Sequence, residues 1–129
     1  MAYQINQLTH EIIGSAIEVH RKLGPGLLES AYRSCLCHEL TLRNIQIKYE
    51  DPLPLQYKGL RLKRGYRVDI IVEGLVAVEV KSVAALAPIH DAQLLTYMRL
   101  GGWRLGLLIN FNVEVLTKGV HRKILGYDH

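Results

Sequence analysis

Two acids and a lysine stand in a stretch that otherwise alternates like two β-strands. Asp69 lies in "YRVDIIV", and Glu79 and Lys81 lie in "VAVEVKS". Carboxylate oxygens bind Mg²⁺, which keeps several waters and leaves room for a phosphate oxygen. The metal polarises phosphorus and acidifies a bound water, while an ammonium group can orient that water or stabilise negative charge. If the three side chains meet, they predict phosphodiester hydrolysis; the alternative is an ordinary exposed sheet face.

The register of the hairpin decides whether the acids meet. Side chains two apart on a strand share a face, so Glu79 and Lys81 project together. A two-residue turn at Glu73-Gly74 would put Asp69 opposite Val78, with the two acids on opposite faces. A connection one residue wider, or a bulge, would put Asp69 opposite Glu79 with β-carbons about 5 Å apart. The sequence leaves both registers open, and we favour the wider one because it gathers all three groups.

The remaining residues of the two strands should form rows by the same alternation. Asp69 is expected to share a face with Arg67 and Ile71. The opposite, apolar row on that strand is expected to contain Val68, Ile70 and Val72, and the one on the partner strand Val76, Val78 and Val80.

Three polar residues on predicted helices are further candidates. Glu29 shares a helical stripe with Tyr32 and would face the core, although an acid in the first turn is also stabilised by the helix dipole alone. Gln93 and Tyr97 stand four apart on one face of a later helix, which directly follows the strand of Glu79. A buried Gln needs hydrogen-bond partners, which a DNA backbone or a water could supply; solvent exposure is the alternative.

A run of cations, "KGLRLKRGYR", contains no acid. Such a strip could neutralise phosphates, or it could be the solvated tip of a hairpin whose cations protect a strand edge. The candidate nucleic-acid contacts in this basic strip are Lys58, Arg61, Lys63, Arg64 and Arg67.

The order of the predicted elements gives the fold class. Helical spacing predicts helices over residues 6–23, 27–43 and 88–100, the first ended by Gly24-Pro25-Gly26. Alternation over residues 45–82, interrupted by Pro and Gly, predicts three or four short antiparallel strands, and residues 104–111 read as a buried strand. A strand, a helix and a strand in succession make the last two strands parallel. The sequence therefore predicts an α/β or α+β fold with a mixed central sheet and helices on both faces, and a possible last strand in "GVHRKIL".

Bulk properties restrict the class of protein. The chain has 129 residues, 22% of them charged, and a net charge of +4. This length and composition predict a single globular domain over residues 1–129. We expect no membrane span and, since "MAYQINQLTH" has no secretory pattern, a cytoplasmic location.

The segment "GLLESAY", with Gly26, Glu29 and Tyr32, resembles the motif for which the GxxExxY family is named. Three further segments occur in the order typical of that family: "YRVDIIVEGLVAVEVKS", "AQLLTYMRL" and "GLLINF". The resemblance covers about residues 8–111. The GxxExxY family belongs to the PD-(D/E)xK nuclease superfamily.

This resemblance implies a restriction-endonuclease-like core and a set of roles. Asp69 and Glu79 would be metal ligands, Lys81 would assist the attacking water, and Glu29 would be an added acid. Gln93 and Tyr97 resemble the QxxxY element of RecB-like nucleases. The chain differs from the superfamily motif in having a valine, not a proline, before Asp69.

We therefore expect a nuclease that hydrolyses DNA with Mg²⁺ or Mn²⁺. A homodimer is a candidate assembly, because a small nuclease needs two active sites to cut a duplex. Two alternatives remain open at this point. One is a nucleic-acid-binding module that keeps the site without efficient chemistry. The other is an interaction or scaffold protein whose acids only solubilise the sheet.

Overall fold

The computed structural model describes residues 4–126, in which three α-helices and a 3₁₀ helix accompany five β-strands. The helices are α1 (Ile5–Leu23), α2 (Glu29–Leu42), α3 (Pro88–Gly101) and η1 (Leu116–Gly119). The strands are β1 (Ile47–Tyr57), β2 (Leu60–Val72), β3 (Val76–Lys81), β4 (Leu105–Asn110) and β5 (Val120–Ile124). The predicted order of elements is confirmed, including the last strand.

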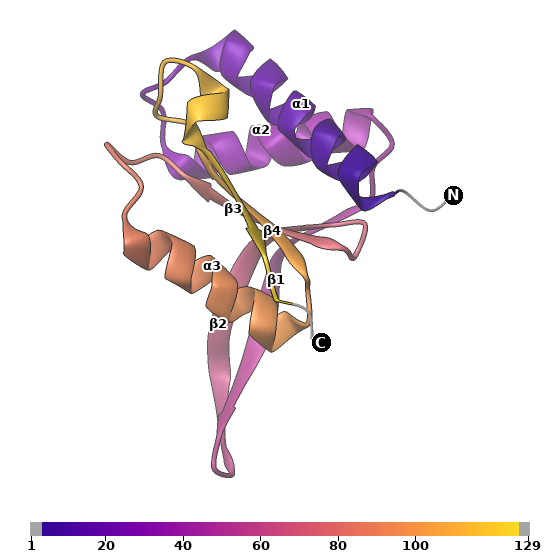
Figure 1. The fold of residues 1–129 in the computed structure, drawn as a ribbon, viewed down its shortest axis with the longest axis vertical. Coiled ribbons are helices and arrows are strands. Elements are labelled where there is room, and N and C mark those ends of the chain that lie inside the picture. The colour runs from indigo at the N-terminus through magenta and orange to yellow at the C-terminus, as the bar shows by residue number, and fades with distance from the viewer. Residues whose placement is uncertain (1–3, 127–129) are drawn as a thin grey trace.

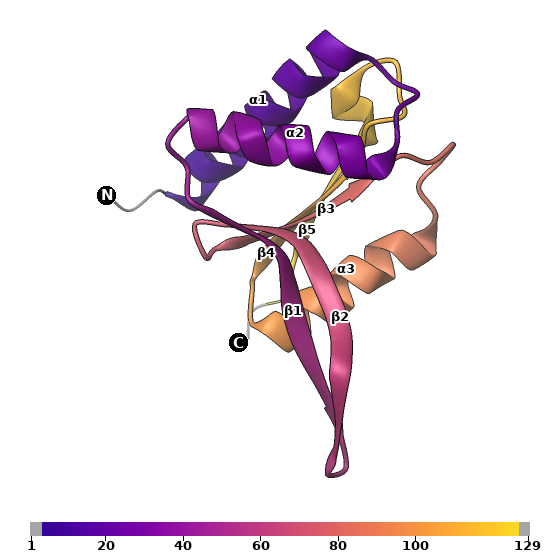
Figure 2. The same cartoon turned by 180° about the vertical axis from the view of Figure 1, so that it is seen from behind.

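The strands form one mixed sheet in the order β1-β2-β3-β4-β5. β3 and β4 are parallel, with Val76 beside Leu105 and Lys81 beside Asn110, and α3 connects them. The other neighbouring strands are antiparallel. Figures 1 and 2 show α1 and α2 packed together on one side of the sheet and α3 on the other. The predicted mixed sheet with helices on both faces is confirmed.

The face under α1 and α2 holds the larger buried cluster. Apolar side chains of α1 recur every three or four residues, so the helix buries one stripe, formed by Leu8, Ile12, Ala16 and Val19. α2 adds Tyr32, whose ring stacks on Phe111 with centroids 4.6 Å apart. The first helix ends at Gly24, which has φ 71° and donates its N–H to the His20 carbonyl.

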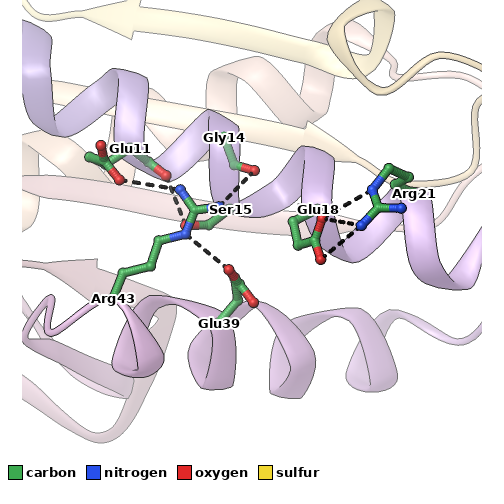
Figure 3. Close-up of polar contacts among 7 residues, drawn as sticks. All are labelled: Glu11, Gly14, Ser15, Glu18, Arg21, Glu39 and Arg43. Carbon is green, nitrogen blue, oxygen red and sulfur yellow. Dashed lines mark hydrogen bonds and ion pairs between the residues drawn. The ribbon is translucent and has the colours of Figure 1, made fainter.

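Arg43 links α2 to α1 on the side away from the sheet (Figure 3). Arg43 follows α2 and lies 2.9 Å from a carboxylate oxygen of Glu39 and 3.2 Å from one of Glu11 on α1. Arg21 pairs with Glu18 within α1 at 2.8 Å. These five charged side chains of the helix pair therefore lie at its surface, each beside an opposite charge.

The other face lies under α3 alone. Pro88 starts this helix, where a missing N–H costs nothing, and Gly102 ends it in the left-handed conformation with φ 80°. α3 lies close to β4 at Gly106, where an added Cβ would be 2.5 Å from the sulfur of Met98. The smaller buried cluster on this face includes Leu94 and Met98.

β1 and β2 extend beyond the rest of the sheet as a long hairpin (Figure 2). β2 pairs with β3 only through residues 70–72, so residues 52–67, which we call the arm, pair only with each other. The arm turns at Lys58-Gly59, both with positive φ. At Gly65 the strands come so close that a Cβ would lie 1.9 Å from the Leu53 carbonyl oxygen.

Candidate active site

The connection between β2 and β3 sets the register of the acidic residues. Val72 pairs with Val76 and Ile70 with Val78, so three residues separate the paired positions. Glu73 and Gly74 both have positive φ, and the Leu75 N–H donates to the Val72 carbonyl at 2.9 Å. The wider of the two predicted registers is therefore the one observed.

Asp69 and Glu79 lie side by side where the backbone pairing of β2 and β3 stops. The Asp69 N–H donates to Glu79 Oε1 at 3.0 Å, and the Val80 N–H donates to Asp69 Oδ2 at 2.8 Å. Each carboxylate thus accepts a bond from the backbone of the opposite strand. This reciprocal pair of bonds fixes two acids that are ten residues apart in the sequence.

The side chains of β2 do not alternate strictly between the two faces of the sheet near Asp69. Val68, expected in one row with Ile70 and Val72, instead joins Ile71 in the cluster under α3. Glu50, on the neighbouring strand, has φ 50°, and no backbone pair forms between Glu50 and Asp69. This local irregularity changes the direction of the side chains on β2, which the period-two pattern could not foresee.

Glu79 is buried, with only 6% of its surface exposed. Burial, followed by the nearby charge of Asp69, raises the pKa of the Glu79 carboxyl to about 8. The hydrogen bond from the Asp69 N–H and the charge of Lys81 act in the opposite direction but do not cancel this effect. A second positive charge near this pair would favour ionisation of Glu79.

Gln93 and Tyr97 form a hydrogen-bonded pair on α3. The Gln93 Nε2 donates to the Tyr97 hydroxyl at 2.8 Å. Tyr97 is 6% exposed, and burial, then the charge of Glu79, raises the pKa of its phenol. The predicted proximity of this pair to the acid-bearing strand is therefore observed.

Glu29 starts α2 and is half-buried. The segment before it is attached to the residue after Lys81, because the Ser82 hydroxyl donates to the Leu27 carbonyl at 2.7 Å. Within residues 4–126, however, no three His, Cys, Asp or Glu side chains gather closely enough to hold a metal ion. The structure thus brings Asp69 and Glu79 together and does not add Glu29 to them as a third ligand.

Two carboxylates are nevertheless a suitable donor set for Mg²⁺. This ion is commonly held by one or two carboxylates, with waters and substrate phosphates completing its shell. Asp69 and Glu79 offer hard oxygen donors, and burial followed by the charge of Asp69 raises the pKa of Glu79, so a cation beside the pair would favour its ionised form. A divalent cation therefore fits the chemistry of this pair.

Sequence reasoning missed two residues that organise the site. Arg33 of α2 lies 3.5 Å from Asp69 Oδ1 and 3.4 Å from Glu50 Oε1. Asn110 is buried, donates to the Val83 carbonyl and accepts from the Val83 N–H, which fixes the loop after Lys81. The signals were present: Arg33 stands one helical turn after Glu29, and Asn110 is a polar residue within an apolar run.

The basic strip lies along the arm. Lys58, Arg61 and Arg67 are exposed, and Arg67 also lies 3.6 Å from Glu50. The side chains of Lys63 and Arg64 lie outside the described parts of the structure.

Comparison with known protein families fits this geometry. The sequence model described as the PD-(D/E)XK nuclease superfamily matches residues 6–123. The chain belongs to this superfamily. Neither the curated proteins nor the solved structures give a match.

Membership supports a nuclease-like function and an α+β fold with a mixed sheet. Nucleases of this superfamily generally use divalent metals. Among the described helices, none combines the length and the apolar character needed to cross a bilayer.

Proposed function

We propose that this protein is a divalent-metal-dependent nuclease that hydrolyses phosphodiester bonds of DNA. The observation that carries the proposal is the reciprocal hydrogen bonding of Asp69 and Glu79, with Lys81 two residues further along the strand. On the motif around Gly26, Glu29 and Tyr32, we place the chain in the GxxExxY family within the superfamily.

Asp69 and Glu79 would hold Mg²⁺ or Mn²⁺, which would supply polarisation of the phosphate and a more acidic water. The two backbone N–H groups that bind these carboxylates keep their oxygens aligned before substrate arrives. The Lys81 ammonium, on the same strand as Glu79, stabilises negative charge that develops on the phosphate or orients the water.

The helices contribute to positioning. Gln93 holds the Tyr97 hydroxyl next to the buried Glu79, so α3 supplies polar groups to the side of the site that faces the groove described below. Glu29 would act as an added acid at the start of α2, reaching the site through water and not as a direct third ligand. The basic strip, Lys58, Arg61, Lys63, Arg64 and Arg67, would hold the nucleic-acid backbone without reading sequence.

Two such sites are needed to cut both strands of a duplex, so we propose that duplex cleavage would involve a homodimer. Size determination by light scattering, with and without duplex DNA, tests this part. A particle of one chain that still cuts both strands at one position would contradict it.

Cleavage of labelled linear, single-stranded and branched DNA with Mg²⁺ or Mn²⁺ tests the activity itself. We expect alanine at Asp69, Glu79 or Lys81 to abolish cleavage while circular dichroism shows an intact fold. Glu39→Gln is the matched control, because Glu39 is an ion-paired acid of the opposite face. Persistent cleavage by both Glu79→Ala and Lys81→Ala would refute the assignment.

A non-catalytic nucleic-acid-binding module is the second candidate, favoured by the presence of two and not three carboxylates in the described site. It predicts salt-sensitive binding without metal-dependent cutting. Melting curves with Mg²⁺, Mn²⁺ and Ca²⁺ test metal binding separately from cleavage. An ion at 100 times its dissociation constant should add roughly 2.7 kcal/mol to the free energy of unfolding.

A further inference from the structure

A groove of about 450 Å³ lies between the arm and α3. Leu55 and Tyr66 line it from the arm, and Ile89, Gln93 and Tyr97 are among the residues that line it from α3. Most of this lining is apolar, with a few polar groups among it, which is typical of sites that bind small organic groups.

Tyr66 offers an open aromatic surface in this groove. It is 52% exposed, and its ring lies 5.8 Å from that of Tyr97, tilted by 39°. Ile89 on the opposite wall is 69% exposed. Nucleobases stack on exposed aromatic side chains largely independently of sequence, because every base has a π-face.

Tyr97 connects the groove with the neighbourhood of the carboxylates. It lines the groove and also packs in one buried cluster with Val68, which precedes Asp69, and with Ala77, two residues before Glu79. A base stacked on Tyr66 would therefore have its own phosphate, or the next one, near Asp69 and Glu79. Lys58 and Arg61, which are exposed toward the tip of the arm that carries Tyr66, supply positive charge for the nucleic-acid strand outside the groove.

This inference deepens the proposed nuclease function and rests on it. We propose that the groove is a subsite for an unpaired nucleotide, so that the substrate class is single-stranded DNA. A base within a duplex is stacked and paired, and it would have to leave the helix at a cost of a few kcal/mol before it could enter. Aromatic rings beside a cationic strip match the combination of stacking and phosphate contacts that single strands require.

The test is equilibrium binding of a single-stranded oligodeoxynucleotide of about 12 nucleotides, within the usual site sizes, carrying one 2-aminopurine. EDTA is present, so no cleavage occurs, and stacking is followed by fluorescence quenching. Tyr66→Ala should weaken binding about tenfold and remove most of the quenching, whereas Tyr66→Phe should retain both. Tyr49→Ala is the matched control, because Tyr49 is an exposed tyrosine of β1 outside the groove.

Equal affinity for wild type and Tyr66→Ala, or an equal loss in Tyr49→Ala, would overturn the subsite. So would duplex DNA that binds as tightly as the single strand with the same dependence on Tyr66. A parallel series with RNA of the same sequence distinguishes DNA from RNA as the ligand. Tyr66-dependent binding of RNA, without Tyr66-dependent binding of DNA, would also overturn the proposal.

The two proposals fail in different ways. Tyr66-dependent binding in EDTA without any cleavage in Mg²⁺ or Mn²⁺ would refute the nuclease and keep the nucleotide subsite. Cleavage of single-stranded DNA that Tyr66→Ala leaves unchanged would keep the nuclease and refute the subsite.

Discussion

The two faces of the sheet are built on different principles. Under α1 and α2, the larger buried cluster consists of apolar side chains, and the ion pairs of Arg43 with Glu39 and Glu11 lie outside it. Under α3, the carboxylate of Glu79 is buried, and Gln93 and Tyr97 form a hydrogen-bonded pair on the covering helix. We therefore expect the face covered by two helices to contribute mainly to stability and the face covered by one helix to carry the proposed chemistry.

The largest test of this contrast is the activity of acid variants from the two faces. Glu79→Gln removes a charge from the proposed metal site and should lower DNA cleavage by about 10²- to 10³-fold or more. Glu39→Gln removes the same charge from the opposite face and should leave cleavage within about twofold. A gel assay in Mg²⁺ measures the cleavage rates of both variants. Equal loss of cleavage in the two variants would show that the two faces do not differ in function.

Stability should depend more on the face under α1 and α2 than on the face under α3. Leu36 is fully buried under α1 and α2, and Leu36→Ala should cost about 2–5 kcal/mol of unfolding free energy through lost burial and a cavity. Ile89 lies on the groove wall of α3 and is 69% exposed, so Ile89→Ala should change stability by less than about 0.5 kcal/mol. Urea unfolding of both variants makes the comparison, and a similar loss at both positions would show that the groove wall is also a packing surface.

The pH dependence of stability should isolate the buried acid. Native Glu79 keeps its proton up to about pH 8, whereas the unfolded carboxyl has the ordinary pKa of 4.5. Between these values the native state binds more protons, so the free energy of unfolding falls as the pH rises, by about 1–3 kcal/mol. Urea unfolding without divalent ions should show this fall in wild type and a smaller one in Glu79→Gln. Identical pH profiles would mean that Glu79 is already ionised in the folded protein.

The smallest effect is expected for the surface charges of the helix pair. Arg21→Ala breaks one exposed pair with Glu18 and should cost at most about 0.5 kcal/mol. Arg43→Ala breaks one ion pair within α2, with Glu39, and one that links α2 to α1, with Glu11, and should cost about 1 kcal/mol. Melting curves of the two variants compare their stabilities. A greater loss of stability in Arg21→Ala than in Arg43→Ala would show that the contact between Arg43 and α1 contributes little.

The sequence predicted those features that depend on local periodicity and chain breakers. The stripe of α1, the proline at the start of α3 and the parallel pairing of β3 with β4 all follow from the order of residue types. The family pattern added the assignment of Asp69, Glu79 and Lys81 to one site. These features need no knowledge of distant contacts.

The register of the hairpin and the interruption at Asp69 could not be derived in the same way. The turn at Glu73-Gly74 is compatible with two registers, and only the packing of both faces selects one. The positive φ of Glu50 belongs to a neighbouring strand, so its effect on Val68 is a tertiary one. Arg33 was missed for a related reason, because its ion pair with Asp69 joins a helix to a strand far away in the sequence.

The position of β1 at the edge of the sheet gives its two prolines a consequence for solubility. An edge strand presents unpaired backbone groups to which a strand from another molecule can add. Pro52 and Pro54 stand two apart on β1, so the missing N–H groups fall on one side of the strand. They interrupt the row of donors on which an intruding strand would have to build, and so protect a long projecting hairpin from becoming a template for aggregation.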